Sequence, residues 1–124
     1  MTDETTHALV TSPVPVHAHA AARDLLDVEG VDPGSCPAGS RRTYVGGFAL
    51  DAGELRAVAV VDVDAAGTAS VRGVAGEVGA MTGLADTLRA SGARRLISRR
   101  PIAAAGADGW AQIGAEAPLW VLEL

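Results

Sequence analysis

The sequence predicts an α/β domain of the α+β type, in which helices flank a mixed, mainly antiparallel sheet. Three strand-like segments, 44–50, 55–63 and 68–74, the last two rich in β-branched residues, are separated by short turns, a pattern typical of an antiparallel meander. The periodicity then changes, and apolar residues recur at helical spacing over about 77–91. A chain of 124 residues, 48% of them hydrophobic, can bury one core, so we expect a single domain over 1–124.

A tail, a helix and a loop are predicted before the meander. Residues 1–12 are mostly polar and are interpreted as a flexible tail or a first edge strand. Pro13 and Pro15 are expected to interrupt that strand, because proline has no N–H to donate to a ladder. Alanine and leucine predict a helix over 16–28, and the Gly, Pro and Ser residues of 30–42 predict a loop.

The strongest strand prediction is residues 55–63, where a nearly continuous apolar run indicates burial on both faces. Gly92 suits the C-terminal cap of the helix at 77–91. The rest of the chain is predicted as a strand at 96–98, a helix beginning within 101–105, a last helical turn at 110–113 and a strand at 119–124.

Composition narrows the classes of function. The net charge of -5 disfavours a general nucleic-acid binder. All 10 basic side chains are arginine, which excludes a lysine nucleophile, a lysine base and a P-loop lysine and is typical of a GC-rich bacterial genome. The single Cys36 cannot form an internal disulfide, and no apolar run is long enough to span a membrane. We therefore expect a cytoplasmic protein without nucleic-acid or membrane partners.

The C-terminal two thirds of the chain resembles the GNAT-type N-acyltransferases. Residues 84–96 resemble the central helix of that family running into the next strand, 110–115 resemble its Tyr-x-x-x-Gly-Phe box, and 119–124 resemble its closing strand. The resemblance covers roughly 44–124. It implies a GNAT-like N-acyltransferase that acts mainly by positioning its substrates, with acetyl-CoA or another acyl-CoA as cofactor and a small-molecule or protein amine as acceptor.

The resemblance also implies a cofactor site. In the family, backbone N–H groups of a glycine-rich loop before the central helix bind the acyl-CoA pyrophosphate. The matching positions here are Gly76, Gly79 and Ala80. The loop departs from the family pattern, because Glu77 would repel a phosphate and Met81 stands at a small-residue position.

No catalytic residue can be assigned. Trp110 stands where the family often has an acidic tyrosine, and an indole N–H is not a practical acid. Arg72 stands in a strand that usually offers a glutamate or a polar group, and it is interpreted either as a ligand for a carboxylate or phosphate or as an exposed arginine. The alternatives are a catalytically silent GNAT-like binding module or subunit of a larger assembly, and an unrelated small α+β ligand-binding protein. We expect a homo- or hetero-oligomer that covers an exposed sheet edge.

The sequence contains three further groupings of reactive or charged residues. His17 and His19 are spaced i, i+2, which on a helix places them on different faces, and with His7 and Cys36 they match no zinc module, so no metal site is expected. Cys36 with one of these histidines as base has the residue types of a nucleophilic pair. The arginines around residues 96–98 predict either an anion site or a solvated surface: Arg94, Arg95, Arg99 and Arg100.

Overall fold

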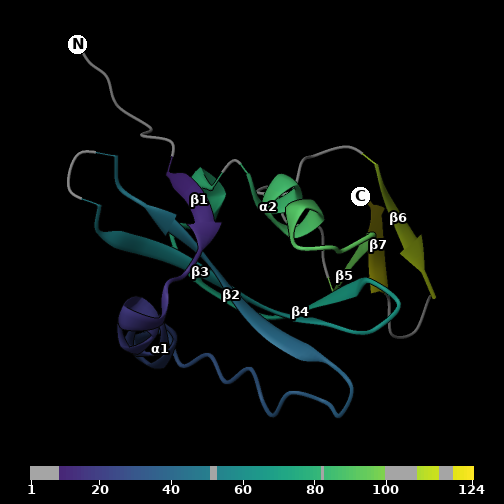
Figure 1. Ribbon diagram of the computed structural model, residues 1–124, viewed down its shortest axis with the longest axis horizontal. Coiled ribbons are helices and arrows are strands. Elements are labelled where there is room, and N and C mark those ends of the chain that lie inside the picture. Colours follow the sequence, from purple (N-terminus) through teal and green to yellow (C-terminus); the bar gives the residue numbers. More distant parts are fainter. Residues whose placement is uncertain (1–8, 51–52, 82, 100–108, 115–118) are drawn as a thin grey trace.

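The computed structural model describes residues 9–50, 53–81, 83–99, 109–114 and 119–124, which form one seven-stranded sheet with a helix on each face (Figure 1). The strand order is β1-β2-β3-β4-β5-β7-β6, and every neighbouring pair is antiparallel except β4 and β5. This confirms the mixed, mainly antiparallel sheet flanked by helices. The elements are β1 (Val10–Pro13), the 3-10 turn η1 (Val16–Ala18), α1 (His19–Val28), β2 (Arg41–Phe48), β3 (Leu55–Val63), β4 (Thr68–Gly76), the 3-10 turn η2 (Val78–Ala80), α2 (Leu84–Ala90), β5 (Arg95–Ser98), β6 (Trp110–Ile113) and β7 (Leu119–Glu123).

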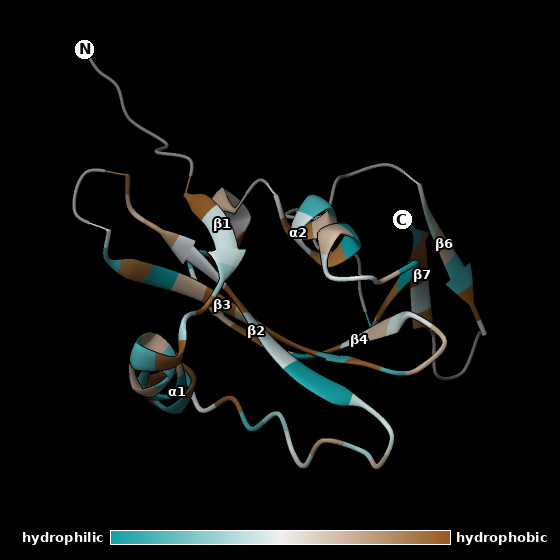
Figure 2. Cartoon of the chain, in the orientation of Figure 1, coloured by the Kyte–Doolittle hydropathy of each residue, from teal (hydrophilic) through white to brown (hydrophobic). Residues whose placement is uncertain are grey.

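The central strand β3 divides the core into two layers. Its residues Val58 and Val60 pack under α1 with Ala22 and Leu26 of that helix. The alternating residues of the same strand pack on the opposite face with Leu84 and Leu88 of α2: Ala57, Ala59, Val61 and Val63. Figure 2 shows that β3 is hydrophobic over most of its length, whereas the start of β2 is hydrophilic. The prediction of a strand buried on both faces is confirmed with the same bounds, 55–63.

The N-terminal region contains an edge strand. β1 pairs with β2 and ends at Pro13, which lies opposite Val45, so the expectation that the strand does not continue through Pro13 and Pro15 is confirmed. Proline is tolerated there because β1 is the edge of the sheet and its outer side needs no ladder donor. The loop prediction is confirmed except at its end, where Arg41 and Arg42 begin β2. Residues 1–8 lie outside the described residues.

The predicted helix at 77–91 is wrong in its first half. Gly76 has a positive φ of 81°, η2 follows as a single turn, and α2 begins only at Leu84. The carbonyl of Ala80, which an α-helix would pair with the Leu84 N–H, instead accepts a hydrogen bond from the Leu9 N–H at 2.9 Å. The N-terminal segment crosses the chain at this point and occupies the Ala80 carbonyl. This is why α2 does not extend back from Leu84 to Ala80, as the apolar spacing predicts.

The predicted helical turn at 110–113 is also wrong, because these residues form β6 and pair antiparallel with β7. Gly109 and Gly114 bound the segment with φ of 92° and 82°. Four residues between two such glycines are too few for a stable helix, and the free side of β7 offers a complete ladder. The helix predicted to begin within 101–105 lies outside the described residues.

Candidate functional site

The parallel strands β4 and β5 separate after a short contact. They pair only at Thr68–Arg95, Ala69–Leu96 and Ser70–Ile97, while β4 continues to Gly76. From residue 71 onward, the outer edge of β4 pairs with no strand of the described chain. Unpaired N–H and C=O groups along such an edge can bind an extended ligand in the manner of an added strand.

A β-bulge lies on β4 at the point where the strands separate. Gly73 is opposite Val60 and Val71 is opposite Val61, so Arg72 is one extra residue without a partner on β3. A bulge re-aims the side chain of the extra residue and increases the local twist. Arg72 is therefore directed by the bulge rather than by the regular alternation of the strand.

A cleft of about 580 Å³ occupies the space beside this edge, within the usual size range of small-molecule sites. The end of β5 and the loop after α1 form its other walls. Its lining is Val31, Asp32, Pro33 and Gly34 from the loop, Val71, Arg72, Gly73 and Val74 from β4, and Ser98 and Arg99 at the end of β5.

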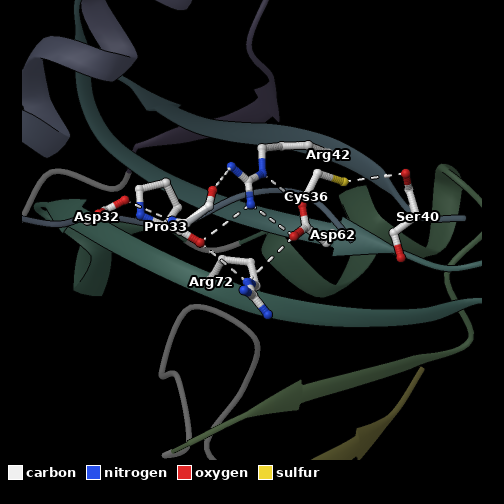
Figure 3. A network of polar contacts seen from close by, with 8 residues as sticks. Asp32, Pro33, Cys36, Ser40, Arg42, Asp62 and Arg72 are labelled. Carbon is white, nitrogen blue, oxygen red and sulfur yellow. Dashed lines mark hydrogen bonds and ion pairs between the residues drawn. The ribbon is translucent and has the colours of Figure 1, made fainter. Parts of the chain in front are cut away.

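One wall of the cleft is held by a buried carboxylate, Asp62 of β3, whose side chain is 2% exposed (Figure 3). Arg42 of β2 binds it in a bidentate manner, with Nε 2.8 Å from Oδ1 and Nη2 3.0 Å from Oδ2. Arg72 approaches the same carboxylate from β4, with Nε 3.5 Å from Oδ2. Asp62 lies on the α1 face, because its neighbours Val60 and Val58 along the alternation pack under that helix.

The same arginines fix the loop that covers them. Arg42 donates from Nη1 to the Gly34 carbonyl at 2.6 Å and from Nη2 to the Pro33 carbonyl at 3.4 Å. Arg72 donates from Nε to the Pro33 carbonyl at 3.4 Å. The cleft wall at residues 31–34 is thus tied to β2, β3 and β4 through one carboxylate and two guanidinium groups.

Electrostatics within this network are mutually stabilising. The hydrogen bonds from Arg42 hold the pKa of Asp62 below its usual value, against the opposing effect of burial, and Asp62 raises the pKa of Arg42. The pKa of the Cys36 thiol is raised by desolvation and by the negative charge of Asp62. A thiol held in its protonated form is a poor nucleophile at neutral pH.

The predicted cofactor residues Gly76, Gly79 and Ala80 lie at the end of β4 and in η2. Their segment is already hydrogen-bonded: the Gly76 N–H donates to Oε2 of Glu29 at 2.7 Å, and the Ala80 N–H donates to the Glu77 carbonyl at 3.0 Å. An anion that used the Gly76 N–H would have to displace the Glu29 carboxylate. Glu77 is exposed and 3.4 Å from Nη1 of Arg56, which partly neutralises it.

The predicted nucleophile and its bases have other partners. Cys36 donates to the Ser40 carbonyl at 3.4 Å. Nε2 of His19 lies 3.1 Å from the Val14 carbonyl oxygen, its ring meets Tyr44 edge-on at 5.1 Å, and His17 is exposed. Within the residues that the structure describes, no three His, Cys, Asp or Glu side chains are placed to hold a metal ion, and His7 lies outside them.

The described arginines around β5 have different surroundings. Arg95 is paired with Glu123 across the β5–β7 ladder at 2.9 Å, Arg94 is exposed before the strand, and Arg99 lines the cleft after it. Arg100 lies outside the described residues. Trp110 packs against the core cluster under α2.

Asp62 and Arg42 are not among the site residues predicted from the sequence. The available signal was an acidic residue inside the apolar run Val58–Val63, where a buried charge needs a partner. Its partner Arg42 is 20 residues away in the chain, so only the strand register brings the two together.

Comparison of the chain with protein-family models, with curated proteins and with solved structures found no match. Among the described helices, none is both long and apolar enough to cross a membrane.

Proposed function

We propose that this protein is a GNAT-like, acyl-CoA-dependent N-acyltransferase whose acyl thioester lies in the cleft between β4 and β5. The observation that supports it most is the separation of the parallel pair after Ser70 and Ile97, which leaves an unpaired strand edge beside a cleft of about 580 Å³. The strand order, with this parallel pair at the junction of two antiparallel parts, supports the GNAT-like assignment. Gly76, Gly79 and Ala80 would bind the phosphates.

The reaction needs little from the side chains of the chain. The acceptor amine nitrogen attacks the thioester carbonyl carbon, the N–C bond forms, the C–S bond breaks, and the departing sulfur takes up a proton lost by the amine. Holding both reactants in the cleft removes the entropy of bringing them together, which can be equivalent to an effective concentration of roughly 10⁵ M or more. Backbone N–H groups at the β4 edge would orient the acyl-CoA.

Thermal unfolding with and without acetyl-CoA tests this proposal. Binding to the native state alone at about 100 times Kd stabilises it by about 2.7 kcal/mol, so 1 mM acetyl-CoA should raise Tm by several degrees. Acetate together with adenosine 3′,5′-bisphosphate, at the same concentration, is the control for binding of the fragments. An unchanged Tm with acetyl-CoA contradicts the enzyme function.

A catalytically silent binding module is a second candidate, and the Glu29 carboxylate on the Gly76 N–H favours it because that contact competes with a phosphate. Incubation with acetyl-CoA and a panel of amines, followed by mass spectrometry, separates the two candidates. An acetylated amine supports the enzyme, whereas a raised Tm without any acetylated product supports the silent module. A response to neither leaves the unrelated ligand-binding protein as the better proposal.

The cellular setting is also a proposal. The single cysteine leaves no internal disulfide, which favours the cytoplasm. We further propose that the chain works as a homo- or hetero-oligomer, since both ends of the sheet, β1 and β6, are edge strands in the described chain.

A further inference from the structure

Contacts with the rest of the protein hold Arg72 in place, but they involve only one nitrogen of its guanidinium group. Its side chain is 38% exposed and lines the cleft, and its two contacts with Asp62 and with the Pro33 carbonyl both come from Nε. Among the described residues, no hydrogen bond or ion pair involves Nη1 or Nη2. Figure 3 shows this end of the guanidinium pointing away from Asp62.

The charge of Arg72 is not cancelled by the carboxylate that orients it. Asp62 already accepts two hydrogen bonds from Arg42, at 2.8 and 3.0 Å, and so two guanidinium groups share one carboxylate. The three side chains together have a net charge of about +1. The cleft lining adds Arg99 and Asp32, whose charges offset each other, so one positive charge is left for a ligand.

The shape of the available group favours a carboxylate. With Nε engaged, the Nη1–Nη2 end offers two donors in one plane, which matches the two oxygens of a carboxylate. A single uncancelled positive charge also suits a monoanion. Because the carboxylate that orients Arg72 is buried and itself bound by Arg42, the donors are oriented before a ligand arrives.

Arg72 is separated from the proposed phosphate-binding segment. It contacts Asp62 on the α1 face of the sheet, whereas Val78 and Ala80 of η2 pack with the core cluster under α2. Three residues of β4 also lie between Arg72 and Gly76, so the two positions are about 13 Å apart along the strand. A ligand anion at Arg72 therefore belongs to the acceptor side of the cleft rather than to the acyl-CoA phosphates.

We propose that the acceptor is a small amine that also bears a carboxylate, such as an α-amino acid, and that Arg72 determines this specificity by binding the carboxylate through Nη1 and Nη2. This inference rests on the proposed acyltransferase function, because it assigns the second substrate of the same cleft. Arg72 is a binding residue in this scheme. It takes no part in proton transfer.

The test compares the common α-amino acids with their primary amides, which differ only in the loss of the carboxylate charge. Binding to the protein is measured by NMR titration without coenzyme A and again with saturating coenzyme A, and acetylation is measured as kcat/KM with acetyl-CoA. We expect at least one acid to be preferred over its amide by about 10- to 100-fold. The comparison uses the unaltered protein and so does not depend on the folding of a variant.

Two variants locate the preference. Arg72→Gln should abolish it while leaving acetyl-CoA binding unchanged, and Arg95→Gln, which removes another strand arginine paired with a carboxylate, should retain it. The inference is overturned if no acid is preferred, if the preference survives in Arg72→Gln, or if inorganic phosphate competes as well as the acid does. Acid preference without any response to acetyl-CoA overturns the acceptor role and the proposed function together, whereas acetyl-CoA binding without acid preference overturns only this inference.

Discussion

Asp62 is the residue on which the cleft wall depends. It is a buried charged residue whose neighbours along β3 are apolar, and it is satisfied by Arg42 from β2 and Arg72 from β4. A buried carboxylate without partners would cost several kcal/mol, so the network must form together with the sheet. The loop at residues 31–34 is then fixed by the remaining donors of the same arginines.

Replacing Asp62 with asparagine should therefore be costly. Asp62→Asn leaves the Arg42 guanidinium, 17% exposed, without its counter-charge, and we expect the free energy of unfolding to fall by about 3–5 kcal/mol. The free energy of unfolding of both proteins is measured by urea denaturation at pH 7. Glu123→Gln removes the carboxylate of an exposed pair and should cost no more than about 1 kcal/mol. Equal losses in the two variants would show that burial of Asp62 does not matter.

The carboxyl group of Asp62 also makes the free energy of unfolding depend on pH. Arg42 lowers the folded pKa of Asp62 below the unfolded value, roughly 3.9. The stabilisation from Asp62 is fully present above the unfolded pKa and is lost as the pH falls through the folded pKa. The difference in unfolding free energy between the unaltered protein and Asp62→Asn should be constant above about pH 5 and shrink below about pH 4. A difference that grows toward acid pH would contradict this linkage.

For single residues, the sequence indicates which residue types need a partner but not which side chains pair with one another. An aspartate inside the run Val58–Val63 indicates a paired buried charge, but ten arginines were available to pair with it. Arg42 was assigned to a loop, and Arg72 could not be distinguished from an ordinary strand arginine, because the bulge that re-aims it depends on the β3–β4 register. Register is set by pairing across the sheet and is not readable from one strand.

At the scale of elements, the end of α1 is joined to the end of β4 by Glu29, the C-cap residue of the helix. Glu29→Ala should free the Gly76 N–H for an anion and remove a negative charge from its surroundings. We expect the Kd for acetyl-CoA to fall about threefold to tenfold, which corresponds to one net hydrogen bond. The Kd is measured by isothermal titration calorimetry, and Glu123→Ala is the control for the loss of one charge. Weaker binding in Glu29→Ala would exclude Gly76 from the phosphate site.

The turn at the end of β4 has little steric tolerance. Gly76 has φ of 81°, and an added Cβ would overlap the Arg56 carbonyl oxygen, whereas a Cβ at Gly92, with φ of 101°, meets nothing within 4 Å. Gly92→Ala should cost about 1–2 kcal/mol for the backbone conformation alone. Gly76→Ala should cost a further 1–3 kcal/mol, roughly, for the overlap. Chemical denaturation compares the two, and equal costs would show that the backbone relaxes freely at Gly76.

The long apolar strand was predicted with its observed bounds and the short strands at 96–98 and 119–124 were confirmed, whereas the short segment at 110–113 was predicted as the wrong element. The strand at 55–63 was predicted with its observed bounds because its apolar run ends at turn residues on both sides. The four residues of β6 have no periodicity that separates a helical turn from a strand, and only pairing with β7 decides. The first half of the helix predicted at 77–91 was overridden by Leu9, a residue more than 70 positions away in the chain.

For the whole molecule, the two ends of the sheet are edge strands in the described chain, β1 at one end and β6 at the other. Ile113 and Leu119 face each other across the β6–β7 ladder and are 58% and 41% exposed. We expect the chain to self-associate through this edge, so that sedimentation equilibrium gives a mass above 12.5 kDa. Ile113→Glu should return the mass toward that of one chain, and Val16→Glu, which alters an exposed valine on η1, should not. One-chain mass in the unaltered protein would contradict this expectation.

The bulge at Arg72 has a consequence for how such a cleft can arise. Val71 and Gly73 are opposite the adjacent residues Val61 and Val60, so the two parts of β4 would already be in phase if they were joined directly. Loss of the single codon for Arg72 would leave a regular strand in which every other side chain keeps its face. One in-frame insertion or deletion thus separates an uninterrupted strand from one that presents a guanidinium to a ligand, and the remainder of the sheet needs no compensating change.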